Sequence, residues 1–249
     1  RTKAVPENDV FRVSGQKIFI TAGEHDLSDN IIHLVLAKLP DAPPGAKGIS
    51  LFLIPKILVN DDGSLGDRNG VNCVSIEEKM GVHGSPTCVL SFEESLGYLV
   101  GEPHKGLEAM FSMMNNERIA VGMQGLGVAE ISYQNALLYA KDRLQGRDLK
   151  GAKKPSEEAD PLLVHPDIRR MLLRAKALID SSRMLSAWTA LAIDRSVKDP
   201  DEKVRKANND LVELMTPIIK SILTDYGVEI SSEMLQIFGG HGYIREYGM

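Results

Sequence analysis

The sequence is poor in cysteine and has no long apolar run. Its only cysteines are Cys73 and Cys88. Their separation matches neither a metal-ligand pattern nor a disulfide framework, which favours a reducing compartment. The six histidines show no metal-ligand spacing either. No apolar stretch approaches the roughly 20 residues that a helix needs to span a bilayer. These absences argue against a metal site, a disulfide-stapled fold and a membrane-spanning protein.

Basic residues are not concentrated anywhere along the chain. The formal net charge is -5, and no run rich in lysine or arginine stands out. General nucleic-acid binding needs such a run to neutralise phosphates, so it is disfavoured. A small anionic ligand needs only a few local donors and stays open. With 249 residues, of which 43% are hydrophobic, the chain has enough apolar material for one large domain or two smaller ones.

The first hundred residues have the pattern of β-strands. Apolar and β-branched stretches alternate with segments rich in turn-forming residues. A Ser-Gly turn at Ser14-Gly15 predicts a hairpin within the first stretch. We expect an antiparallel β-sandwich or open barrel over residues 1–100. The strand-like stretches are 11–23, 30–39, 48–56 and 87–93.

Residues 101–249 have the pattern of long helices. The predicted helices cover residues 105–142, 166–197 and 201–238, and proline begins the second. Helices of this length pack well as an antiparallel bundle of the four-helix type. Pro217 predicts a kink or break near Met215. The expected fold class is therefore α+β, with a sheet domain (1–100) followed by a helical bundle domain (101–249).

One carboxylate interrupts an apolar stripe on the first predicted helix. Glu117 shares a helical face with apolar or small residues three or four positions apart. Burying an unpaired carboxylate is costly, so we expect it to be paired, protonated or facing a cavity. A buried carboxyl suits a general base, and a structural salt bridge explains the pattern equally well. The other members of the stripe are Leu107, Met110, Met114, Val121, Gly125 and Val128.

Two further features suit a ligand, although each has an ordinary structural explanation. Gly239-Gly240 ends the third predicted helix, where glycine supplies a left-handed cap. With Gln236 in the last turn, this segment offers backbone donors without bulk to a flat or phosphate-bearing ligand. Thr21 ends a strand near the aromatic Phe19, which suits a planar cofactor but is also common sheet chemistry.

Five segments together resemble the acyl-CoA dehydrogenase family. GQKIFITAGEHD is similar to the family's G-x-K-x-W-I-T-N-G strand, and EEKMGVHGSPTCVLSFE is similar to a later stretch of the same domain. MMNNERIAVGMQGLGVAE resembles the opening of the family's C-terminal bundle. YAKDRLQGR resembles its R-x-Q-F-G turn without the phenylalanine, and QIFGGHGYIREYGM resembles Q-x-x-G-G-x-G-Y-x-x-E. The segments HGSPTC and GGHGYIREYGM most resemble the bacterial branch of the family that includes 3-methylmercaptopropionyl-CoA dehydrogenases.

The resemblance implies a flavoenzyme that oxidises an acyl-CoA thioester to its trans-2-enoyl form. In such enzymes a glutamate removes the α proton and FAD accepts the β hydride. It further implies a homodimer or homotetramer, electron-transfer flavoprotein as the electron acceptor, and a location in the bacterial cytoplasm. The family's N-terminal helical domain, one flavin loop and the usual base are expected to lie outside these 249 residues.

The resemblance also assigns roles to individual residues. Phe19 and Thr21 would contact the flavin ring. Arg143 and Gln145 would reach the FAD of a neighbouring subunit. Gln236, Gly239 and Gly240 would line the adenosine end, and Asn115 and Arg118 the CoA channel. Glu117 is the secondary candidate for the base, and the main one is expected beyond Met249.

Three other functions remain open from the sequence. An acyl-CoA oxidase would return its electrons to oxygen. A non-catalytic relative would bind DNA or a partner protein, which the acidic balance disfavours. A folded fragment acting only as a scaffold would lack flavin.

Overall fold

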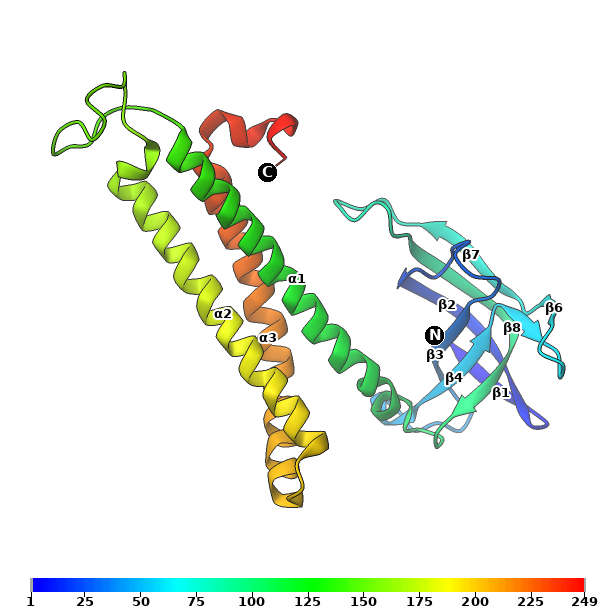
Figure 1. The fold of residues 1–249 in the computed structure, drawn as a ribbon. Helices are drawn as coiled ribbons and strands as arrows, with labels where there is room; N and C mark the ends of the chain where they lie inside the picture. Colours follow the sequence, from blue (N-terminus) through cyan, green and yellow to red (C-terminus); the bar gives the residue numbers. More distant parts are fainter. Residues whose placement is uncertain (1, 249) are drawn as a thin grey trace. The chain divides into compact units, whose positions relative to one another are not determined.

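The computed structural model describes residues 2–248, which form two compact units, residues 2–114 and 115–248. The first unit holds the strands and the second most of the three long helices (Figure 1). The predicted order of a sheet domain followed by helices is confirmed. The predicted domain boundary at residue 100 coincides with the end of strand β8. As a division between domains it stays a prediction.

The first unit is a ring of strands. Six strands follow the order β2-β1-β3-β4-β8-β7, and β2 also pairs with β8, which closes the ring. Every pairing is antiparallel except that of β1 with β3, which is parallel at Lys3 and Lys38. A separate pair is formed by β5 and β6. The strands are β1 (Lys3–Glu7), β2 (Val10–Thr21), β3 (Ile32–Lys38), β4 (Ile49–Pro55), β5 (Ile57–Val59), β6 (Leu65–Arg68), β7 (Val71–Ile76) and β8 (Thr87–Val100).

The hairpin expected at Ser14-Gly15 is wrong, because β2 runs through both residues as one strand. The turn lies earlier, between β1 and β2, where Asn8 has a φ of 54°. Gly15 serves close packing instead. A Cβ at this position would lie 2.7 Å from the Cα of Thr2, and its φ of +141° is disfavoured for other residues.

The interior of the ring follows the two-residue period of its strands. Along β3, Val35 and Ala37 point inward, and along β8 Leu90 and Phe92 do the same. The neighbouring side chains of this core are Ala4, Val13, Phe52, Ile54, Val71 and Cys88.

The ring has an opening between β2 and β3. Strand β1 lies between them but meets β3 only at the pair Lys3–Lys38 and reaches β2 only as far as Ser14. Beyond these points, no strand of the described residues fills the space between Lys17–Thr21 and Ile32–Ala37. The wall of the ring is therefore incomplete there.

The predicted helices are confirmed within one residue at each end. They are α1 (Gly106–Asp142), α2 (Pro166–Lys198) and α3 (Glu202–Ile237). Pro166 begins α2, and the Asp201 carboxylate caps α3 by accepting from the Lys203 amide at 2.9 Å. Within residues 2–248 no helix combines the length and apolarity needed to cross a membrane.

Of the kink or break expected near Met215, the break is wrong, because α3 continues through Pro217. Proline removes one backbone hydrogen bond, and the carbonyl left without a partner belongs to exposed Glu213, where water can replace the donor. Met215, Thr216 and Ile219, on either side of the proline, are buried in the helical core. Their packing offsets the local cost.

Small residues let α1 and α3 approach closely. A Cβ on Gly125 would lie 2.4 Å from the carbonyl oxygen of Leu223. Around this contact, Ala129 and Ala136 of α1 are buried with larger side chains from the other helices. Those larger side chains include Met171, Leu172, Ile179, Ile219, Leu223, Ile230 and Met234.

Candidate functional site

Phe19 and Thr21 lie at the end of β2, in a distorted segment. The pairing of β2 with β8 shifts register between Lys17 and Ile20, and Phe19 has a φ of +60°. This conformation is strained for an aromatic residue. The Phe19 side chain is 69% exposed, and Thr21 is exposed beside the strand end. The bulge thus presents an aromatic ring and a hydroxyl at the surface.

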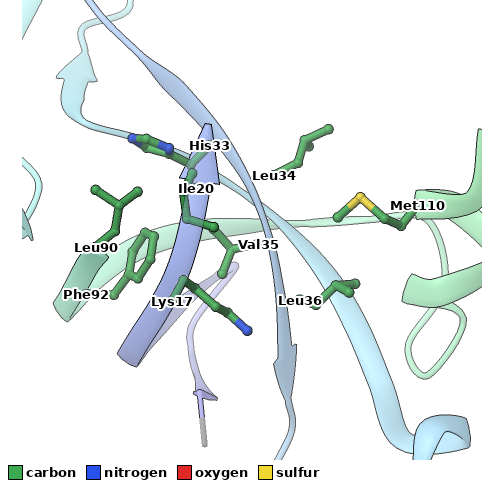
Figure 2. Close-up of a pocket in the computed structure, with 9 residues that line it drawn as sticks. All are labelled: Lys17, Ile20, His33, Leu34, Val35, Leu36, Leu90, Phe92 and Met110. Carbon is green, nitrogen blue, oxygen red and sulfur yellow. The ribbon is translucent and has the colours of Figure 1, made fainter. Parts of the chain in front are cut away.

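A cavity of about 180 Å³ opens where β2 and β3 are not bridged (Figure 2). Its walls are mostly apolar, and two ionisable side chains, Lys17 and His33, contribute to them. In Figure 2 the Lys17 amine points away from the His33 ring. The remaining lining residues are Ile20, Leu34, Val35, Leu36, Leu90, Phe92 and Met110.

Burial controls the ionisation of both groups in this cavity. It lowers the pKa of the His33 imidazole, against the opposing attraction of Glu24, and it lowers the pKa of the Lys17 amine. The His33 ring packs edge-on against Phe92, and its Nε2 is buried with no hydrogen-bond partner among the described residues. Sequence analysis missed both residues. The available signal was that His33 alternates with inward-pointing Val35 and Ala37.

Arg143 and Gln145 follow α1 on a short extended segment held by its backbone. The Arg143 carbonyl accepts from the Leu162 amide at 2.9 Å, and the Gln145 amide donates to the Asp160 carbonyl at 2.8 Å. Both side chains are exposed. Because its backbone is fixed, this segment presents the Arg143 guanidinium and the Gln145 amide in one place, which suits an anionic ligand.

Asp160, which the sequence analysis missed, anchors the loop after this segment. Its carboxylate is fully buried. It accepts from the amides of Asp148 (3.0 Å), Lys153 (2.9 Å) and Lys154 (2.7 Å), and Arg147 lies 3.4 Å away. These amides, Asp148 first, and the Arg147 charge lower the pKa of Asp160 to about 2.

The glycine turn after α3 has an uncrowded surface. Gly239 has a φ of +58°, which confirms the predicted left-handed cap. A Cβ on Gly239 or Gly240 would meet no atom within 4 Å. Beside the turn, the Gln236 side-chain oxygen accepts from the Tyr243 hydroxyl at 3.0 Å. No packing contact among the described residues therefore requires Gly240 to lack a side chain.

The structure places these residues at one end of the helical unit. Tyr139, one turn before Arg143, stacks on Phe238, which immediately precedes Gly239 (ring centroids 4.3 Å apart). Figure 1 shows the end of α1 and the end of α3 side by side there. Arg143, Gln145, Gln236, Gly239 and Gly240 thus belong to one region of the unit.

Glu117 does not have the buried position expected for it. Its side chain is exposed, as are Val121 and Val128 of the same stripe. Gly125 of the stripe packs against α3, but the positions of Glu117, Val121 and Val128 lie outside the helical core, to which α1 contributes Leu126, Ala129 and Ala136. The expectation of a buried carboxylate is therefore wrong for the described residues.

The residues near Glu117 lie far from the glycine turn. Asn115 and Arg118 are half-buried near the start of α1 in the helical unit. At 1.5 Å per residue, the helix carries Arg143 about 40 Å from Glu117. One chain therefore does not bring Glu117 and Arg143 into a common site.

Comparison with known proteins assigns the family. Residues 104–249 match the family described as acyl-CoA dehydrogenase, C-terminal domain. The chain is 47% identical over its whole length to 3-methylmercaptopropionyl-CoA dehydrogenase of Ruegeria pomeroyi, and 40% identical over 99% to a butyryl-CoA dehydrogenase of Syntrophomonas wolfei. It spans 42% of the length of each relative. The chain belongs to the acyl-CoA dehydrogenase family, whose members are FAD flavoproteins.

Solved structures agree with this assignment. Butyryl-CoA dehydrogenase from Megasphaera elsdenii matches 99% of the chain with a TM-score of 0.75 and 28% identity, and the match covers 55% of that protein. ACDH-11 of Caenorhabditis elegans, solved with C11-CoA, matches the whole chain with a TM-score of 0.81 and 23% identity, over 38% of its own length. At that identity the second match shows the fold alone.

Proposed function

We propose that the protein containing this chain is an FAD-dependent acyl-CoA dehydrogenase, which oxidises an acyl-CoA thioester to the trans-2-enoyl-CoA. The observation that supports this most is the strained end of β2. The chain belongs to a family of flavoproteins. At the end of β2, Phe19 has a left-handed backbone conformation, and its ring is exposed beside the Thr21 hydroxyl. Strain of this kind is found at functional sites.

The residues present fit FAD. An exposed aromatic ring and hydroxyl suit the edge and face of a planar ring system. At the end of the helical unit, no atom lies within 4 Å of the positions that a Cβ of Gly239 or Gly240 would occupy, so a ligand can approach the backbone there. When bound, FAD supplies the hydride acceptor that no amino-acid side chain provides.

In the strand unit, Thr21 and Phe19 orient the flavin. The Thr21 hydroxyl donates a hydrogen bond to the polar edge of the ring. Phe19 covers part of the ring and excludes water from it, since an apolar side chain replaces solvent at that surface. The strain at Phe19 is the cost of placing the aromatic ring there.

In the helical unit, two groups of residues bind the rest of the cofactor. Arg143 and Gln145 present a cation and an amide to the pyrophosphate of FAD held by a neighbouring subunit. Gln236, Gly239 and Gly240 line its adenosine end, where glycine allows close backbone approach. This arrangement requires a homodimer or homotetramer.

The CoA thioester lies along the part of α1 with which the helical unit begins, at residues 115–118. Asn115 and Arg118 contact the pantetheine arm. Glu117 is the secondary candidate for taking the α proton. Electron-transfer flavoprotein then reoxidises the enzyme, in the bacterial cytoplasm.

Anaerobic titration tests the proposal. The whole protein is purified, its flavin absorbance is recorded, and butyryl-CoA and 3-methylmercaptopropionyl-CoA are added in turn, since relatives are named for these substrates. We expect bound FAD and loss of its oxidised absorbance with at least one thioester, and no loss with CoA alone. A protein that binds no FAD, or holds FAD that no fatty thioester bleaches, contradicts the proposal.

A further inference from the structure

Four rings join the end of α1 to the segment after α3. Tyr139 stacks on Phe238, and His241 stacks on Tyr247 with ring centroids 4.5 Å apart and an interplanar angle of 8°. The Tyr139 and His241 rings meet edge to face at 6.1 Å. Figure 1 shows this last segment folded back beside the end of α1.

A hydrogen bond links the two stacked pairs. The Tyr139 hydroxyl oxygen lies 2.8 Å from Nδ1 of His241 and 3.5 Å from the carbonyl oxygen of Phe238. Both Tyr139 and His241 are half-buried, so water competes for this bond less than at the surface. One hydroxyl thus contacts the residues on both sides of Gly239-Gly240.

The glycine turn lacks side chains of its own to hold it. A Cβ placed on Gly239 or Gly240 would meet no atom within 4 Å. Glycine also has more conformational freedom than any other residue. The position of the turn is set by contacts of the flanking residues. These are the Tyr243–Gln236 hydrogen bond on one side and the contacts of Phe238 and His241, both of which Tyr139 touches, on the other.

We infer that Tyr139 is a positioning residue for the glycine turn, and that its hydroxyl holds Gly239–Tyr243 in the shape that receives the adenosine end of FAD. This role rests on the proposed function, because it concerns the same cofactor. Tyr139 itself need not touch FAD. It acts through His241 and Phe238.

Tyr139→Phe tests the role, because it keeps the ring stacked on Phe238 and removes only the hydroxyl. In the whole protein we expect FAD to bind about three- to tenfold more weakly, the range for losing one hydrogen bond. In the FAD-free protein, the amides of residues 239–243 should exchange with solvent faster. Tyr226→Phe is the matched control, since the half-buried Tyr226 on α3 has no hydrogen bond within residues 2–248. It should change neither measurement.

Variants of His241 separate positioning from simple packing. Asparagine places an oxygen close to the position of Nδ1, so His241→Asn should keep more FAD affinity than His241→Ala. His241→Ala should lose at least as much as Tyr139→Phe, because it removes the hydrogen bond and also the ring that stacks on Tyr247. The double variant Tyr139→Phe/His241→Ala should lose no more than His241→Ala alone, because His241→Ala already removes the bond to the Tyr139 hydroxyl.

Two results would overturn the inference. One is wild-type FAD affinity and wild-type exchange in Tyr139→Phe, and the other is losses that add in the double variant. If the unaltered protein binds no FAD, the proposed function fails instead. In that case unchanged exchange at 239–243 in Tyr139→Phe still rejects the coupling, and faster exchange supports it.

Discussion

Gly125 of α1 and Gly227 of α3 face each other across a backbone contact. A Cβ on Gly227 would lie 3.0 Å from the carbonyl oxygen of Gly125, and one on Gly125 would lie 2.4 Å from that of Leu223. Both obstacles are main-chain atoms, which cannot rotate away as a side chain can. The two helices therefore depend on glycine at this crossing.

Gly125→Ala should destabilise the protein. Alanine favours a helix by about 1 kcal/mol over glycine, but overpacking against backbone costs about 1–3 kcal/mol, and at 2.4 Å the clash should win. Gly127→Ala is the control, because a Cβ there meets nothing within 4 Å. It should raise stability by about 0.5–1 kcal/mol. Urea unfolding of both variants decides the matter, and a stabilised Gly125→Ala would contradict the close contact.

Phe19→Gly should stabilise the fold and weaken flavin binding. Glycine removes the cost of a left-handed conformation, about 1–2 kcal/mol, while the ring that we propose to cover the flavin is lost. Ile18→Gly is the control: Ile18 is also exposed in β2 but has no positive φ, so glycine there should destabilise. Melting temperature and FAD affinity are measured together. Phe19→Gly with lower stability would show that the conformation is not strained.

Asp160 should make the loop at 147–160 sensitive to acid. Its pKa falls from an ordinary 3.8 to about 2 in the folded chain, so its contribution to stability is complete above pH 3.8 and is lost as the pH falls toward 2. Asp160→Asn cannot accept from the same set of amides. At neutral pH it should speed proteolysis within 147–160, and it should flatten the dependence of unfolding free energy on pH between about 4 and 2.

The exposed Glu158 provides the comparison for Asp160, because it lies in the same loop and accepts no hydrogen bond among the described residues. Glu158→Gln should leave proteolysis unchanged. Equal acid sensitivity in Asp160→Asn and the unaltered protein would argue against the carboxylate as the anchor.

Glu117→Gln should leave flavin reduction by acyl-CoA largely intact. The side chain of Glu117 is exposed to water within residues 2–248, whereas a general base must be held within hydrogen-bond reach of the proton it takes. Stopped-flow reduction under anaerobic conditions measures the rate, with Glu108→Gln on the exposed first turn of α1 as the control. A loss of reduction by several orders of magnitude, with FAD still bound, would make Glu117 the base.

Local signals were sufficient to predict much of this chain. Proline at the start of α2 and glycine after α3 act over a few residues, so these helix limits could be read without knowing the fold. The same holds for the two-residue period of β3 and β8. Family motifs around Phe19, Arg143 and Gly239 extend this to the expected site, whose residue roles remain predictions.

Only the tertiary structure decided the rest, because it depends on contacts between distant residues. Packing of Met215 and Ile219 kept α3 continuous at Pro217, and the absence of a covering element among residues 2–248 left Glu117 exposed. The His33 cavity arises because β1 stops short between β2 and β3. Tyr139 and His241, about a hundred positions apart, meet only because α1 and α3 end together. No local propensity specifies such a meeting, since its free energy comes from burial and hydrogen bonding after the helices have packed.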